Sequence, residues 1–316
     1  MNTVRTGRSQ IARLQITKLQ IPMNGVVIID KPAGLTSHDV VNRVRRILGQ
    51  RSVGHLGTLD PSATGVLPIV LGNLTRLAQF YLHSEKTYEG VIRFGFATDT
   101  YDADGERTTP QQNMHIKLDD VRAVAAQFQG VIEQVPPPFS AKKIAGVPAY
   151  KLARKNQEVV LQPVQVEIKE FEILDTTADQ ASFRARVASG TYIRSVAHEM
   201  GQKLGCGAHL ASLRRTVVAE FASEDAHSLA ALEAAMQQGI AESLFIHPRR
   251  LAPQLPCVTA NEESAGLIRS GRAVNLPEMS RAPQVKVFYG QRDLIAIADR
   301  IGGTLFHPGI VFTGKN

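Results

Sequence analysis

Residues 54–71 read GHLGTLDPSATGVLPIVL, and the fold is best approached from this stretch. Its first twelve residues hold three glycines and one proline, which are too many breakers for a helix or a strand. Residues 66–71 are apolar again, as expected of a chain that returns to a buried interior. The stretch therefore predicts a loop that carries Asp60 and is anchored on the core.

The segments around this loop mix strands with helices. Residues 26–29 form a short apolar run typical of a buried strand, and Thr36 with Asp39 resembles a helix-capping box. Apolar residues at helical spacing up to residue 48 then predict a basic amphipathic helix. Further strands are predicted at 88–96, 164–174 and 181–187, and helices at 118–128, 195–204 and 229–238. Because no regular strand–helix–strand repeat emerges, we predict an α+β fold with a mixed, largely antiparallel sheet flanked by helices.

Both ends of the chain differ from its middle. Residues 1–22 carry four basic residues and no acid, which suits a disordered basic tail, a transit peptide, or an extension upstream of a true start at Met23. The tail and the start at Met23 are the simpler interpretations, and we expect a disordered tail. A proline-flanked break at 251–256 precedes strand-like segments at 285–289 and 293–298. We therefore predict a main domain over 23–250 and a small β-rich domain over 251–316.

The composition excludes several classes of protein. The chain is 43% hydrophobic and 21% charged, and no apolar run is long enough to cross a bilayer, so we do not expect a membrane protein. The net charge of +7 permits a polyanionic partner, although residues 1–22 supply four of these charges and leave +3 for the rest. Cys206 and Cys257 lie far apart without metal-site spacing, which excludes a disulfide framework and argues against a zinc site. We expect no metal and two reduced thiols.

A basic segment opens at three consecutive prolines, 136–138. Between residues 142 and 155 the chain holds no acid. Such a run is either a solvated helical face or an arm that grips phosphates, and the residues alone favour neither. Its basic and aromatic members are Lys142, Lys143, Tyr150, Lys151, Arg154 and Lys155.

Three other places could carry chemistry. Asp60 is either an ordinary turn residue or a catalytic carboxylate on a loop. Arg194 stands near the start of a predicted helix, where it either pairs with a surface acid or holds a catalytic carboxylate ionised. Arg214 and Arg215 are either phosphate contacts or a plain surface pair. The acidic run 99–105 lacks the calcium-loop pattern and is interpreted as a turn rich in aspartate.

Taken together, these segments resemble the TruB family of tRNA pseudouridine synthases. The resemblance covers residues 25–216, and its most specific motif is the loop around Asp60. Other matching motifs lie at 25–41, 86–88, 190–194 and 209–215. Residues 136–164 resemble the family's RNA-gripping thumb, and the small C-terminal domain would then be a PUA-like RNA-binding domain.

The resemblance implies a role for each residue. Asp60 would be the nucleophile in the isomerisation of uridine 55 in the TΨC loop, and Arg194 would hold its carboxylate ionised. Tyr88 and Leu213 would pack around an extruded base, and His55 would occupy the space that the base leaves. Contacts with the RNA backbone would come from Lys142, Lys143, Tyr150, Arg154 and Arg214.

The same resemblance implies the setting of the reaction. We expect a cytoplasmic monomer that needs no cofactor and no obligate protein partner, because the isomerisation oxidises nothing and loses nothing. Two alternatives are a guide-RNA-dependent synthase acting on ribosomal RNA and a non-catalytic tRNA-binding or tRNA-folding protein. A glycosidase is a third, but it would require a second positioned carboxylate, and the sequence places none beside Asp60.

Overall fold

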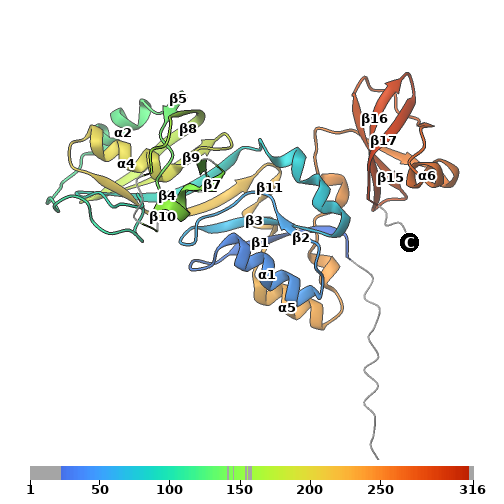
Figure 1. Ribbon diagram of the computed structural model, residues 1–316, viewed down its shortest axis with the longest axis horizontal. Helices are drawn as coiled ribbons and strands as arrows, with labels where there is room; N and C mark the ends of the chain where they lie inside the picture. The colour runs from blue at the N-terminus through green and yellow to red at the C-terminus, as the bar shows by residue number, and fades with distance from the viewer. Residues whose placement is uncertain (1–22, 141, 145, 154, 156–158, 313–316) are drawn as a thin grey trace, which may run out of the picture.

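The computed structural model describes residues 23–140, 142–144, 146–153, 155 and 159–312 (Figure 1). The predicted tail over 1–22 and the thumb residue Arg154 lie outside these ranges.

A ten-stranded mixed sheet forms the main body. Eight strands follow the order β12-β1-β3-β10-β4-β9-β8-β5, while β2 pairs with β3 and β11 with β10. Within this sheet, as far as the structure describes it, only the pairs β1–β12 and β3–β10 are parallel, which confirms the prediction of a largely antiparallel sheet. The strands are β1 (Gly25–Lys31), β2 (Val53–His55), β3 (Thr64–Leu71), β4 (Lys86–Phe94), β5 (Gly130–Gln134), β8 (Val164–Thr177), β9 (Gln180–Val187), β10 (Ala208–Val218), β11 (Phe221–Ala222) and β12 (Ala226–His227).

Helices cover this sheet at its two ends (Figure 1). One pair, α1 (Ser37–Leu48) and α5 (Leu229–Gln237), packs on β1 and β3. The other pair, α2 (Leu118–Ala126) and α4 (Ile193–Lys203), packs on β4, β8 and β9. The predicted capping box of α1 is present, since the Thr36 hydroxyl accepts from the Asp39 amide while Asp39 accepts from the Thr36 amide.

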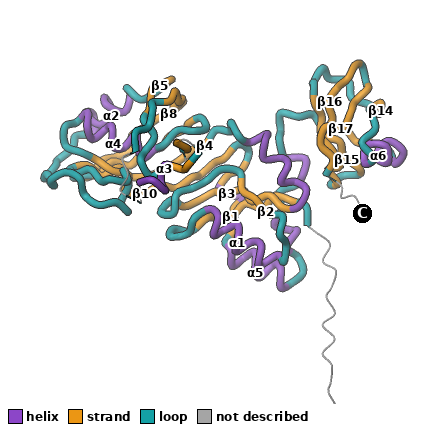
Figure 2. The backbone as a smooth tube through the Cα atoms, in the orientation of Figure 1, coloured by secondary structure: helices purple, strands orange, loops and turns teal. Residues whose placement is uncertain are grey.

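A second sheet follows in the order β13-β15-β16-β17-β14, with helix α6 against it (Figure 2). This confirms the small β-rich C-terminal domain. Its elements are β13 (Cys257–Ala260), α6 (Glu262–Arg269), β14 (Val274–Asn275), β15 (Gln284–Tyr289), β16 (Asp293–Gly302) and β17 (Leu305–Val311). We propose the predicted division into 23–250 and 251–316 as the two domains.

A continuous apolar cluster joins the two sheets. Leu74 and Leu77 come from the 3₁₀ turns at Gly72–Tyr81, while Phe288 and Phe312 come from the C-terminal domain. All four are almost fully buried. The C-terminal domain is thus packed on the main body rather than merely tethered to it.

Between β5 and β8 lie three short elements. They are a hairpin of β6 (Lys143–Ile144) with β7 (Val147–Pro148), and helix α3 (Ala149–Ala153). This is the segment predicted to grip RNA. Its hairpin is a separate two-stranded sheet that does not pair with the main sheet in the described part of the chain.

Candidate active site

A cavity of about 290 Å³ opens at the centre of the large sheet. This volume is at the lower end for small-molecule sites, so it suits one nucleotide better than a larger ligand. Residues from five parts of the chain converge on it. They are Gly57, Thr58, Leu59, Asp60, Lys86, Tyr88, Ser140, Ser189, Gly190, Thr191, Tyr192, Ile193, Arg194 and Leu213.

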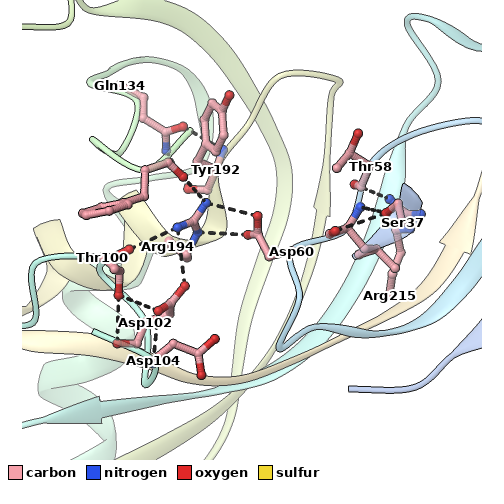
Figure 3. A network of polar contacts seen from close by, with 12 residues as sticks. Ser37, Thr58, Asp60, Thr100, Asp102, Asp104, Gln134, Tyr192, Arg194 and Arg215 are labelled. Carbon is pink, nitrogen blue, oxygen red and sulfur yellow. Dashed lines mark hydrogen bonds and ion pairs between the residues drawn. The ribbon is translucent and has the colours of Figure 1, made fainter. Parts of the chain in front are cut away.

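Asp60 and Arg194 form an ion pair at this cavity (Figure 3). Asp60 Oδ2 lies 2.9 Å from Arg194 Nε, and Asp60 Oδ1 accepts a hydrogen bond from Nη2 at 3.2 Å. The arginine side chain is only 6% exposed, whereas the aspartate side chain is 38% exposed. The buried guanidinium therefore holds the carboxylate in place while the carboxylate stays open to a ligand.

Arg194 lies in the first turn of α4 and has further acceptors. Nη1 donates to the Thr100 carbonyl at 3.2 Å, and Nη2 donates to the Phe139 carbonyl at 3.2 Å. Gln134 fixes the turn before the helix, because its side-chain amide exchanges two hydrogen bonds with the Tyr192 backbone. The guanidinium is thus held in one orientation by several separate segments.

A second carboxylate, Asp102, lies on the other side of Arg194 (Figure 3). Its Oδ2 is 3.4 Å from Arg194 Nη1, and its side chain is only 10% exposed. Burial raises the pKa of Asp102, although the Thr100 hydroxyl and Arg194 oppose that rise. Tyr101, just before it, has a φ of 64°, a conformation that costs about 1–3 kcal/mol in a non-glycine residue. The turn at residues 99–105, which carries Asp102, is therefore part of the site.

The contact of this turn with Arg194 was not predicted from the sequence. The run 99–105 was predicted only as a turn rich in aspartate, and the structure adds that Asp102 is buried against the arginine. The three aspartates within six residues were the available signal. They gave no indication of a partner 92 residues away. Asp102 also corrects the statement that no second carboxylate can be placed near Asp60, but Arg194 lies between the two, so they do not flank an open bond.

The loop that carries Asp60 is held from beneath by two buried cations. Arg215 donates to the carbonyls of Val66, Thr58 and Gly57 at 2.9–3.1 Å. Lys31 donates to the carbonyl of Pro61, the residue after Asp60, at 3.0 Å. Both side chains are fully buried, which places the loop backbone rigidly over the sheet.

Arg215 was wrongly interpreted. It is neither a phosphate contact nor half of a surface pair, because it is fully buried under the loop. Arg214 points the other way, as alternation along β10 requires, and its guanidinium makes two hydrogen bonds to Asp30 at 2.9 and 3.0 Å.

Tyr88 and Leu213 complete the apolar side of the cavity. Tyr88 lies on β4 and is 7% exposed, and its hydroxyl interacts with the guanidinium of Arg215. Leu213 lies on the neighbouring β10, opposite Gly90 of β4. Residues distant in sequence are thus brought together as the motifs suggested.

Comparison with known proteins agrees with this geometry. Residues 45–193 match the model of the TruB family pseudouridylate synthase N-terminal domain, and 194–253 match the tRNA pseudouridylate synthase B C-terminal domain. The tRNA pseudouridine synthase B of Solibacter usitatus is 44% identical over 292 residues, covering 92% of this chain and all of the relative. The enzyme of the same name from Aquifex aeolicus is 39% identical, covering 90% of this chain and 98% of the relative.

The chain belongs to the TruB family of pseudouridine synthases.

Solved structures show the same TruB-type fold in larger assemblies. A Cbf5-Nop10-Gar1 complex matches with a TM-score of 0.68 at 26% identity, covering 92% of this chain and 85% of that one. An H/ACA RNP bound to a substrate RNA containing 2'-deoxyuridine also gives 0.68, at 24% identity and covering 92% and 86%. The latter likeness concerns the fold alone. The predicted enzyme class, a pseudouridine synthase, is confirmed by the family.

Four of the residues predicted to contact RNA do not line the cavity. His55 ends β2 and is partly buried, and its Nδ1 has no hydrogen-bond partner in the described part of the chain. Burial lowers its pKa, so the ring is neutral at pH 7. Lys142 and Lys143 are exposed at the β6–β7 hairpin, while Tyr150 in α3 is partly buried.

The described residues contain neither a candidate metal site nor a candidate membrane-spanning helix. No group of three or more His, Cys, Asp or Glu side chains within them could hold a metal ion. No helix within them is long and apolar enough to span a membrane.

Proposed function

We propose that this protein isomerises uridine 55 in the TΨC loop of tRNA to pseudouridine, with Asp60 as the nucleophile. One observation carries the proposal. The carboxyl group of Asp60 is exposed to a nucleotide-sized cavity while a buried guanidinium holds it in place. The tRNA substrate is supported by relatives called tRNA pseudouridine synthase B, which match this chain over most of its length.

The reaction breaks the N1–C1′ bond and forms a bond from C1′ to C5 of the same uracil. C5 loses its proton and N1 gains one, so the product is an isomer of the substrate. Asp60 attacks C1′ or the uracil ring as a nucleophile, which divides one difficult step into two easier ones. Arg194 and Asp102 keep the attacking oxygen in one orientation, so little reorganisation is required at the moment of reaction.

The target base must leave its stack to reach Asp60. Tyr88 and Leu213 offer an apolar surface that would offset part of the lost stacking. His55, neutral and at the edge of the same loop, would fill the vacated space. The exposed lysines Lys142 and Lys143, together with Tyr150, Arg154 and Arg214, would contact the RNA backbone without reading its sequence. In this proposal the protein acts in the cytoplasm as a monomer and requires no partner protein.

The experiment is tritium release from tRNA labelled at uracil C5, using purified protein alone. Wild type should release one tritium per tRNA, and Asp60→Asn should release none while binding tRNA with similar affinity. Full activity of Asp60→Asn would refute the nucleophile. A wild type that binds tRNA without releasing tritium would favour the guide-RNA-dependent or non-catalytic alternatives.

A further inference from the structure

Lys86 is a residue of the cavity that the proposed chemistry leaves without a role. It lies on β4 two residues before Tyr88, so both side chains project from the same face of the strand. Both line the cavity with Asp60. The stem of Lys86 passes beside the loop, since a Cβ placed on Gly57 would lie 3.7 Å from Lys86 Cε. Its side chain therefore forms part of the cavity wall beside the loop that carries Asp60.

The ammonium of Lys86 lacks a negative partner. Its Nζ donates to the Ser84 carbonyl at 2.7 Å, and no carboxylate among the described residues lies within ion-pair distance. The neighbouring acid in sequence, Glu85, is held by Lys169 and Arg186 instead. Asp60 is already paired with Arg194. Among the residues that line the cavity, Lys86 is thus the cation that no carboxylate compensates.

Burial makes this charge costly. It lowers the pKa of Lys86 to about 8, and the positive charge of Arg215 adds to the effect. Lys31 is also buried, but its ammonium donates to three carbonyls, which explains it as a structural residue. Lys86 has no such set of acceptors in the described part of the chain. A half-buried cation without an acid is best explained by an anion that arrives with the ligand.

We propose that Lys86 forms an anion subsite that binds a phosphodiester flanking the extruded nucleotide. The inference rests on the proposed function, because it takes RNA as the ligand. Uracil and ribose are neutral near pH 7, so the backbone phosphates are the anions that RNA brings to the cavity. Their binding would compensate the charge of Lys86 and would place the nucleotide relative to Asp60.

A double-mutant cycle between protein and RNA tests the contact. The protein is varied as Lys86→Met, in an Asp60→Asn background that prevents turnover. A TΨC stem-loop RNA carries either a normal phosphate or a neutral methylphosphonate on each side of the target uridine. In the protein that retains Lys86, one of the two replacements should weaken binding about tenfold. In Lys86→Met the same replacement should change the dissociation constant less than about twofold.

Matched variants separate charge from structure. Lys86→Arg should retain the coupling to the phosphate, and Lys117→Met, which removes an exposed lysine from the start of α2, should leave it intact. If Lys86→Met is unstable, comparison of the phosphate and methylphosphonate RNAs on the protein that retains Lys86 remains informative. Equal weakening of both proteins by every methylphosphonate would overturn the proposal. So would a Lys86→Met variant that binds normally and loses only single-turnover rate.

The pH dependence gives an independent measure. A bound phosphate raises the pKa of Lys86 above its free value of about 8. Affinity should therefore be complete below pH 8 and fall as the pH rises above it. Arg215, Asp60, Arg194 and Tyr88 face the same space, and Lys31 titrates nearby, but all are unchanged in Lys86→Met. The difference between the two pH profiles isolates Lys86. Tritium release by wild type tests the proposed function separately, so failure of either idea can be recognised.

Discussion

At the scale of single residues, the site is governed by how charges are compensated. Arg194 is shared between Asp60 and Asp102, but the two carboxylates differ in exposure and therefore in role. The more exposed one is open to a ligand, while the buried one and two backbone carbonyls fix the guanidinium. A charged hydrogen bond in such a setting contributes about 1.5–3 kcal/mol. Asp102 should therefore act through Arg194 as a positioning residue.

We predict that Asp102→Asn lowers the single-turnover rate of pseudouridine formation about 10–100-fold, which corresponds to that range of free energy. Its affinity for tRNA should be nearly unchanged, because Asp102 lies behind the arginine. Asp104→Asn is the control, since Asp104 is exposed in the same turn and only its backbone amide contacts Asp102. Similar rates for both variants would show that the acidic turn does not position Arg194.

Much of this arrangement could be predicted from the sequence, but not its buried charges. The motifs indicated that Asp60, Tyr88, Arg194 and Leu213 belong to one site, and all four line the same cavity. Arginine is rarely fully buried, so a surface interpretation of Arg215 was reasonable and wrong. Its burial depends on three carbonyls of a loop 149–158 residues earlier in the chain, and such pairing has no local signal.

At the scale of elements, periodicity predicted most helices and strands, with boundaries shifted by a few residues. The strand β10 was missed as a strand because its pairing with β4 contains two register shifts, which disturb the alternation. The helix α6 and the strand β5 were also missed, since both are short. These omissions matter for the site, because β10 carries both Leu213 and Arg215.

The contact between β3 and β10 explains a requirement for glycine at position 65. Gly65 has a φ of 102°, and a Cβ there would lie 2.2 Å from the Arg215 carbonyl. Gly65→Ala should therefore push β10 away and destabilise the fold by more than about 3 kcal/mol, combining backbone strain with overpacking. Gly34→Ala is the matched control, because Gly34 has a φ of 81° but open space around it.

Urea unfolding and tritium release measure the two glycine variants. Gly34→Ala should lose only the cost of the left-handed conformation, about 1–2 kcal/mol, and should keep its activity once folded. Gly65→Ala should lose activity as well, since its strand bears the loop of Asp60. Equal losses of stability would mean that the close approach of β10 is not the cause.

At the scale of the whole molecule, the two sheets share one apolar cluster in addition to the separate core that each of them has. The connecting segment belongs to that cluster, because Leu251 and Ala252 are fully buried and Leu255 is 8% exposed. The Ala252 amide also donates to the Tyr81 hydroxyl at 2.9 Å and to Glu220 at 3.0 Å. The connection therefore acts as part of the main body's core, although its prolines suggested only a linker.

Two truncated chains test this view of the connection. A chain that ends at residue 256 keeps Leu251, Ala252 and Leu255, whereas one that ends at residue 250 loses them and leaves Tyr81 without its backbone partner. Burial of two leucine side chains contributes about 3–6 kcal/mol, so the shorter chain should unfold at a clearly lower urea concentration. Both chains lack the C-terminal sheet equally, which makes the difference between their unfolding midpoints the relevant measurement. Coincident midpoints would mean that residues 251–256 only link two independent units, and that the apolar cluster owes its stability to the main body alone.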